Sequence, residues 1–251
     1  MTALYRAVQF NPQCTVCSLS TRQAVSGQSE RPIKDVILVA ISAYPGKREE
    51  ATKMSLAPGT INEDTSGAGA FLRRCLYWAI ECDPTWDGPP INELVYFTNA
   101  IKCSPRDKTV KDIHRSRCRD TWLLPELTAL PTGVPLLLAG SEALKAIHGL
   151  DATIANYRGA VHNWRGHPTV TTFNPIEVER GVFYKTTIDE EDVKRDLEAL
   201  LRSKKTLRDS DIDKIVKTRM WNPVPVGSMM WYFRKDINII KQEIMNYANT
   251  R

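Results

Sequence analysis

The fold is decided by Val36-Ile-Leu-Val-Ala-Ile41, an uninterrupted apolar run that follows the turn signal Arg31-Pro32. A short run of this kind is typical of a strand buried on both faces, as at the centre of a parallel sheet. Three similar runs follow, at residues 94–98, 134–139 and 169–173, with helical or loop sequence between them. Strands that alternate with helices indicate a parallel, doubly wound sheet. We therefore expect an α/β fold, a three-layer αβα sandwich around a four-stranded parallel sheet.

Helical patterns lie between and after these strands. Apolar residues recur at helical spacing over residues 67–81, and Ser141 is the expected N-cap of a helix after the third strand. Residues 189–203 have an acidic start, an amphipathic pattern and a basic end, as the helix dipole favours. We expect this helix to close a domain at residues 1–203, followed by a basic, helical C-terminal extension at residues 204–251.

Three further stretches carry local predictions. His162 and His167 flank Trp164-Arg165-Gly166, which favours a surface hairpin over a DNA-facing loop. Met229-Met-Trp-Tyr-Phe233 is rich in large apolar side chains, and packing onto the main domain is the favoured interpretation over base stacking. Residues 236–248 have the pattern of a final helix.

Composition excludes some classes of protein. The 251 residues suffice for one well-buried core, and no apolar stretch approaches the roughly 20 residues of a membrane span. The first residues lack the apolar region of a signal peptide, so we expect a soluble, cytoplasmic monomer that does not contact membranes. The formal net charge of +5 fits a phosphate-binding face, but many proteins that never bind nucleic acid share such a charge.

Polar or small residues stand where each expected strand ends. Ser42, Asn99, Gly140 and Asn174 follow the four runs in turn. Because ligands of such sheets bind outside the carboxyl ends of the strands, these four segments are expected to converge on one crevice. The first strand is followed by a polar loop that extends to about residue 66, and a loop of this length in a compact domain is usually functional.

The six cysteines are Cys14, Cys17, Cys75, Cys82, Cys103 and Cys118. Two of them, Cys75 and Cys82, belong to a helical pattern and are expected to be small core or helix-end residues. The others form two pairs, a CxxC at the N-terminus and a pair in a polar, basic stretch. Two such pairs suit an iron–sulfur or zinc site in an intracellular enzyme. The pattern alone leaves a bound metal and free thiols equally open.

Several segments, in order, resemble motifs of the iron–sulfur (type 4) uracil-DNA glycosylases. The family motifs are an opening CxxC, GEAPGxxE, a glycine-rich helix start, TNxxKCxPP, LGxxA and TYHPA. The segments that match them in whole or in part are Cys14 to Cys17, Ser42-Ala-Tyr-Pro-Gly-Lys-Arg-Glu49, Ser66-Gly-Ala-Gly69, Thr98-Asn-Ala-Ile-Lys-Cys-Ser-Pro105, Ala139-Gly-Ser-Glu-Ala143 and Thr172-Phe-Asn-Pro-Ile176. The resemblance covers about residues 14–203, and the combination is far more specific than any single motif.

The resemblance implies a DNA glycosylase, an enzyme that flips a base out of DNA and hydrolyses its N-glycosidic bond. It implies a four-iron four-sulfur (4Fe–4S) cluster held by Cys14, Cys17, Cys103 and Cys118, since Cys118 falls where the family has its fourth ligand. The implied role of the cluster is structural, clamping the N-terminal segment against the loop after the second strand.

Both catalytic positions of the family are altered. Its first-motif carboxylate and its last-motif histidine are replaced by Ala43 and Asn174, neither of which titrates near neutral pH. Glu49 matches the second acid of the first motif, and it either serves water and the sugar cation or is a solvated loop carboxylate. Asn174-Pro175 resembles the mismatch-specific uracil and thymine glycosylases, whose last motif also begins Asn-Pro.

The base pocket is expected to differ from that of the family. Asn99 matches the asparagine that reads the flipped base, and by rotation it suits a uracil-like or a cytosine-like edge. The alternative is an asparagine that caps its own turn. Tyr44 is a second expected base contact, and Asp64 stands where the family has a stacking aromatic residue. We therefore hypothesise an atypical pyrimidine substrate, bulky or sugar-decorated as in some viral genomes, and a role in antiviral defence.

DNA is the expected partner, with contacts around the crevice. Ile176 and Val178 stand where the family inserts a wedge into the duplex, and Lys102 and Arg180 are expected to meet phosphates. For Arg180, a surface ion pair is the alternative. Two other functions stay open: a silent relative that binds DNA or a modified base without cutting, and an enzyme that builds or remodels a hypermodified base.

Overall fold

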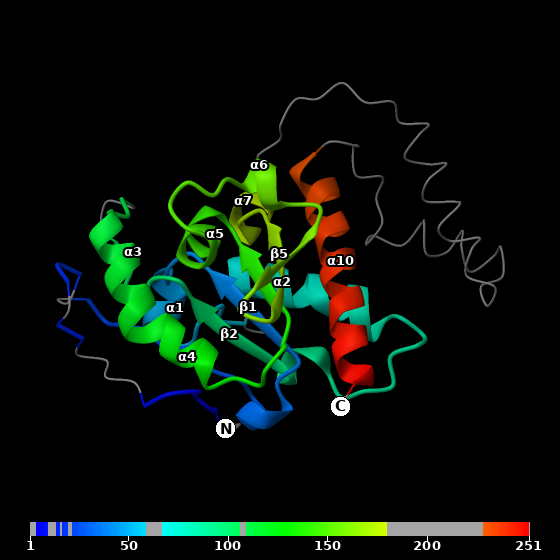
Figure 1. Ribbon diagram of the computed structural model, residues 1–251. Coiled ribbons are helices and arrows are strands. Elements are labelled where there is room, and N and C mark those ends of the chain that lie inside the picture. Colours follow the sequence, from blue (N-terminus) through cyan, green and yellow to red (C-terminus); the bar gives the residue numbers. More distant parts are fainter. Residues whose placement is uncertain are drawn as a thin grey trace.

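A computed structural model describes residues 4–9, 14–15, 17–19, 22–58, 67–105, 109–179 and 228–250. In these residues a five-stranded sheet, in the order β2-β1-β3-β5-β4, lies between helices on both faces (Figure 1). The strands are β1 (Leu38–Ser42), β2 (Val95–Asn99), β3 (Leu136–Ala139), β4 (Val161–Trp164) and β5 (His167–Thr172). The expected α/β architecture is confirmed, with one strand more than the four expected.

The additional strand, β4, pairs antiparallel with β5, whereas the other four strands pair in parallel. Arg165 and Gly166, which join β4 to β5, have positive φ angles of 50° and 88°, as a two-residue hairpin turn requires. The expected surface hairpin is therefore confirmed. The count of four strands was wrong because β4 alternates between exposed and half-buried side chains and has no continuous apolar run.

The helical elements are η1 (Ile33–Asp35), α1 (Lys47–Thr52), α2 (Ala68–Leu76), η2 (Tyr77–Glu81), η3 (Ile91–Glu93), α3 (Asp112–Cys118), η4 (Arg119–Leu123), α4 (Leu124–Thr128), α5 (Ser141–His148), α6 (Ile154–Tyr157), α7 (Pro175–Glu179) and α10 (Met229–Asn249). The helix expected over residues 67–81 is confirmed as α2 continued by the π-helical turn η2. Two details differ: α1 lies within the expected loop, and Gly140 takes the N-cap position expected for Ser141. The helix expected over residues 189–203 lies outside the described residues.

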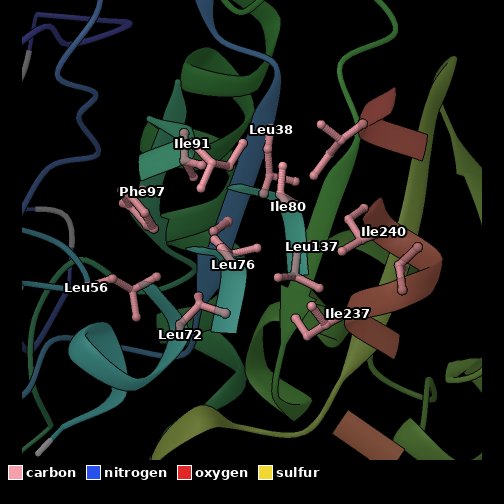
Figure 2. Packing of buried hydrophobic residues seen from close by; sticks show 14 of the residues in the cluster. Leu38, Leu56, Leu72, Leu76, Ile80, Ile91, Phe97, Leu137, Ile237 and Ile240 are labelled. Atoms are coloured by element: carbon pink, nitrogen blue, oxygen red, sulfur yellow. The ribbon is translucent and has the colours of Figure 1, made fainter. Parts of the chain in front are cut away.

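Alternate residues of β1, which lies between β2 and β3, pack into two separate cores. Leu38 and Ala40 belong to a core shared with α2, α7 and α10. Val39 and Ile41 belong to a second core, shared with α4 and α5. Every side chain of β1 is buried, as its uninterrupted apolar run predicts. In Figure 2, side chains of the first core gather between the sheet and its helices: Leu38, Leu72, Leu76, Leu137, Ile237 and Ile240.

The C-terminal helix α10 is part of the first core. Its buried residues recur at helical spacing: Met229, Phe233, Asp236, Ile237, Ile240 and Ile244. The expected packing of residues 229–233 is confirmed, and the helix begins at Met229 instead of residue 236 because these residues continue the same buried stripe. The hydroxyl of Ser228 caps the helix by accepting the N–H of Trp231. No helix among the described residues is long and apolar enough to cross a membrane.

Candidate active site at the carboxyl edge of the sheet

The four segments that follow the parallel strands lie side by side at one edge of the sheet. Ser42 pairs with Asn99 at the ends of β1 and β2. The N–H of Gly140 donates to the carbonyl oxygen of Thr172 over 2.9 Å, which joins the ends of β3 and β5. A Cβ atom at Gly140 would lie 3.2 Å from the Cβ atom of Asn174, so these two segments touch. The four segments therefore converge as expected, whereas a crevice between them stays a prediction. We call this region the carboxyl edge.

Glu49 belongs to the carboxyl edge and is not a solvated loop carboxylate. On α1, its Oε2 accepts the N–H of Gly46 over 2.7 Å. Its Oε1 accepts the N–H of Leu56 over 2.6 Å and the Nδ2 of Asn99 over 3.4 Å. Burial raises the pKa of this carboxyl group above its ordinary value, although these three hydrogen bonds act in the opposite direction. The group is therefore fixed in place and, when ionised, is a stronger base than an exposed glutamate.

Asn99 is fully buried at the end of β2. Its Nδ2 donates to the hydroxyl of Ser55 over 3.1 Å as well as to Glu49. That hydroxyl donates its own proton to the carbonyl oxygen of Ser26 over 2.9 Å, so toward Asn99 it can only accept. These contacts fix the carboxamide, whose Oδ1 has no hydrogen-bond partner among the described residues. Asn99 therefore does not cap its own turn.

Ala43 and Asn174, the two altered catalytic positions, also lie at the carboxyl edge. Ala43 is buried directly after β1, and its carbonyl oxygen accepts the N–H of Ile101 over 3.0 Å. Asn174 accepts the N–H of Ile176 on its Oδ1 over 3.2 Å, as an Asx turn does at the start of a helix. The Asn174 carboxamide is thus held by its own turn and offers the site only its amide nitrogen as a donor.

The four cysteines named by the resemblance lie together. Cys103 and Cys118 are buried in one small apolar group, and Cys17 packs against it. Burial, and then the nearby thiols of Cys118, Cys14 and Cys17, raise the pKa of Cys103 to about 12. Burial also raises the pKa of Cys118 to about 11, although the main-chain N–H and the ammonium group of Lys102 act against this. The structure therefore brings together the two cysteine pairs that are far apart in sequence.

Two aromatic residues border this cysteine group. The indole N–H of Trp122 donates to the Sγ of Cys14 over 3.4 Å. Tyr44 packs against the same group and is half-buried. Burial, and then the carboxylates of Glu142 and Glu177, raise the pKa of the Tyr44 phenol. Because Tyr44 follows Ala43 and lies near α7, it connects the cysteine group with the carboxyl edge.

The other two cysteines take no part in the group. Cys75 packs against the first core from α2, and Cys82 is exposed at the end of η2, as expected. Among the described residues, no three His, Cys, Asp or Glu side chains form a group that could hold a single metal ion. Four thiols are, however, the usual donor set of a 4Fe–4S cluster, and the gathering of four cysteines apart from the other two fits that set.

Two of the expected DNA contacts are wrong. Lys102 is fully buried, and its Nζ donates to Glu126 over 2.7 Å, to the Thr98 hydroxyl over 2.6 Å and to the carbonyl oxygen of Asn99 over 2.9 Å. Val178 is only 3% exposed and packs into the first core from α7. Neither side chain can reach a phosphate or a base step, because each is enclosed by the protein itself.

The structure does not test the expected roles of Ile176, Asp64 and Arg180. Ile176 is half-buried in α7, two residues after Asn174, and its wedge role stays a prediction. Asp64 and Arg180 lie outside the described residues.

A buried ion pair that the sequence analysis missed lies beside the end of β5. Nη2 of Arg158 lies 3.0 Å from Oδ1 of Asp236, a fully buried residue of α10, and the guanidinium stacks 4.0 Å from the ring centroid of Tyr232. Burial raises the pKa of Asp236 to about 6, although Arg158, the Thr172 hydroxyl and the Gly159 N–H act against this. A lone carboxylate within the apolar stripe of α10 was the available signal, because such a group needs a buried partner.

A separate cavity of about 230 Å³ lies between α2, η2 and α10. Its lining is mainly apolar and includes Phe71, Cys75, Trp78, Met230, Phe233 and Ile237. None of the predicted site residues lines it, so this cavity is not part of the candidate active site.

Neither a family model nor a curated protein matches the sequence.

Proposed function

We propose that the protein is a DNA glycosylase that excises an atypical pyrimidine. The observation that carries the proposal is the contact between Glu49 and Asn99: a carboxyl group of raised pKa lies beside a buried carboxamide with an unused acceptor. A general base next to a base-reading amide is the combination that hydrolytic base excision requires. The resemblance to the uracil-DNA glycosylases supports it in two ways: Asn99 matches the asparagine that reads the flipped base, and Glu49 matches the second acid of the first motif.

In the proposed reaction, Asn99 accepts an N–H of the flipped base on its Oδ1 and holds the base. The ionised Glu49 takes a proton from a water molecule whose oxygen attacks C1′ of the deoxyribose, and its charge stabilises the oxocarbenium-like sugar. The N-glycosidic bond breaks, and its electron pair leaves with the base. Asn174 offers the departing base a neutral amide donor where the family has a histidine.

The atypical substrate is proposed because the family acid, histidine and stacking aromatic are all replaced in this sequence. The test is incubation of the purified protein with DNAs that carry uracil, mismatched thymine, or hydroxymethylated and glucosylated pyrimidines, followed by mass spectrometry of the released base. Release of a modified base, with alkali-labile abasic sites in the DNA, is the expected result and would fit a role in defence against modified viral DNA. Efficient release of uracil alone would overturn the substrate class.

Replacing Glu49 with glutamine is expected to slow base release by about 100-fold, because glutamine cannot accept the proton of the attacking water. In the unchanged protein, the rate of base release should increase with pH, and the midpoint of the increase should lie above 4.5, the ordinary glutamate pKa. The reason is that Glu49 can take a proton only when it is ionised, and its pKa is raised. Single-turnover release, measured from pH 4 to 8, checks both results. The matched control is Glu50→Gln on the same helix. Equal rates for Glu49→Gln and Glu50→Gln would rule out the catalytic role.

We also propose that Cys14, Cys17, Cys103 and Cys118 hold a 4Fe–4S cluster, which ties the N-terminal segment to the segment after β2. The cluster would supply structural cross-linking of these segments. The grouping of the four thiols supports this proposal.

Replacing Cys103 with serine is expected to remove most of the iron, because the cluster loses one of its four thiolate ligands. Iron and acid-labile sulfide in anaerobically purified protein are the measurements, with about four of each per chain expected in the unchanged protein. Cys75→Ser, outside the group, should retain its iron. Iron-free, colourless protein from the unchanged sequence would refute the cluster.

A second candidate function is a silent relative that binds the base without excision. It is favoured by the engagement of the Asn174 Oδ1 in its own turn and by the absence of an acid at Ala43. Tight DNA binding without abasic sites would support it, whereas a change in base mass with the glycosidic bond intact would indicate a hypermodification enzyme.

A further inference from the structure

The segment at residues 24–29 extends the sheet beside β2. Gln28 pairs antiparallel with Phe97, and each N–H donates to the other residue's carbonyl oxygen, over 2.9 Å and 2.8 Å. Residues paired in this way place their side chains on the same face of the sheet, so Gln28 lies beside Phe97. Asn99 lies two residues after Phe97 on β2, so its side chain shares a face of the sheet with that of Gln28. Ser26 lies close to Asn99 as well, because the Ser55 hydroxyl accepts from the Nδ2 of Asn99 and donates to the carbonyl oxygen of Ser26.

These three neighbouring residues hold buried polar atoms without partners. Ser26 and Gln28 are 3% and 1% exposed, and Asn99 is fully buried. Within the described residues, the Ser26 hydroxyl, both polar atoms of the Gln28 amide and the Asn99 Oδ1 lack any hydrogen-bond partner. Buried polar groups are normally satisfied, so such a cluster indicates the place of a polar ligand. The nearby Arg73 is already engaged with Glu30 and with the carbonyl oxygen of Leu56.

The unpartnered atoms are richer in acceptors than in donors. The amide nitrogen of Asn99 donates to Glu49 and Ser55, so the atom left without a partner is Oδ1, which can only accept. Gln28 adds an amide oxygen and an amide nitrogen, and the Ser26 hydroxyl can accept or donate. The carboxylate of Glu49 adds negative charge beside Asn99. These protein atoms therefore match a base whose hydrogen-bonding edge carries two N–H groups and one acceptor. They match less well a base whose edge carries a single N–H between two acceptors.

We propose that Gln28 is a second base-reading residue and that the site takes a 4-aminopyrimidine, the cytosine type of base. The amino group donates its two hydrogens to the oxygens of Asn99 and Gln28, and the adjacent ring nitrogen accepts from the Gln28 amide. A 4-oxopyrimidine such as uracil or thymine has a single N–H on this edge and leaves one of these oxygens unpaired. The inference rests on the proposed function, whose substrate class it narrows.

The test compares DNAs that carry matched amino and oxo bases in one sequence: cytosine with uracil, 5-methylcytosine with thymine, and 5-hydroxymethylcytosine with 5-hydroxymethyluracil, the last pair also glucosylated. The unchanged protein should release the amino base at least tenfold faster within the pair that it uses. Gln28→Leu should lower this ratio at least fivefold without lowering Tm, because it removes two unpartnered polar atoms from the interior. Gln23→Leu, an exposed glutamine of the same segment, should leave the ratio unchanged.

A preference for the oxo base, or an unchanged ratio in Gln28→Leu, would overturn the inference. DNA binding, measured by fluorescence anisotropy with the same DNAs, tests the assignment of the base separately from the proposed glycosylase activity. If no base is released but the amino base binds more tightly and Gln28→Leu removes that difference, the glycosylase proposal fails and the base assignment stands. If neither release nor binding distinguishes the members of a pair, the base assignment fails.

Discussion

Replacing Lys102 with methionine is expected to lower the free energy of unfolding by about 3–5 kcal/mol. The ammonium group of Lys102 lies 2.7 Å from a carboxylate oxygen of Glu126, and both side chains are almost completely buried. Without the lysine, the donors that Glu126 keeps among the described residues are the Thr98 hydroxyl and the Gly27 N–H, over 2.7 Å and 3.1 Å. An uncompensated carboxylate then stays in the interior, far from water.

Urea unfolding followed by circular dichroism measures this loss. The double variant Lys102→Met with Glu126→Leu should recover part of it, because the unpaired charge is gone. Lys47→Met changes an exposed lysine and should alter the free energy of unfolding by less than about 0.5 kcal/mol. If Lys102→Met were as stable as Lys47→Met, the buried ion pair would not exist in solution.

Arg158→Met is expected to cost about 3–5 kcal/mol at pH 7 and less at pH 5. The variant removes the only cation paired with Asp236 in the described structure and also the stacking on Tyr232. The pKa of Asp236 is already raised to about 6, and without Arg158 it must rise further. As pH falls below the pKa of Asp236 in the variant, the folded variant takes up a proton. The unfolded chain, with an aspartate pKa of about 3.9, does not take up this proton. The cost of the buried charge is thereby relieved.

Unfolding free energies of Arg158→Met and the unchanged protein, measured in urea at pH 5, 6 and 7, give the difference at each pH. Between the double variant Arg158→Met with Asp236→Leu and the single variant Asp236→Leu, the difference should not depend on pH in this range, because neither protein contains the titrating group. A difference that is constant with pH for the single variant would show that Asp236 is not a buried, titrating carboxyl group.

The sequence predicted the parts of the fold that depend on local pattern. The run at residues 36–41 identified the central strand because burial on both faces requires continuous apolar sequence. The edge strand β4 was not found, since one exposed face leaves only a short alternation. Lys102 was wrongly expected to contact DNA because local sequence does not show its distant partner, Glu126. A lysine in a basic, polar stretch is normally a surface residue.

The candidate site was predictable only where topology or motif identified it. Asn99 ends β2 and Asn174 follows β5, two strands of the parallel part of the sheet, and the rule for carboxyl ends places them together. Gln28 and Ser26 could not be found in this way, because residues 24–29 have no strand pattern and reach the site through tertiary pairing with Phe97. The orientation of the Asn99 carboxamide likewise depends on Ser55 and Glu49, whose contacts follow from folding of the loop after β1.

The place of α10 in the chain affects how the protein is made. Its side chains complete the first core against β5 and α2, although more than forty residues separate it from α7, the preceding described helix. During synthesis on the ribosome, the first core therefore lacks one of the helices that enclose it until residues 229–249 have been translated. Nascent chains that stop earlier expose the apolar surface of Leu72 and Val170, on two of the elements that α10 contacts, which makes them targets for chaperones and proteases.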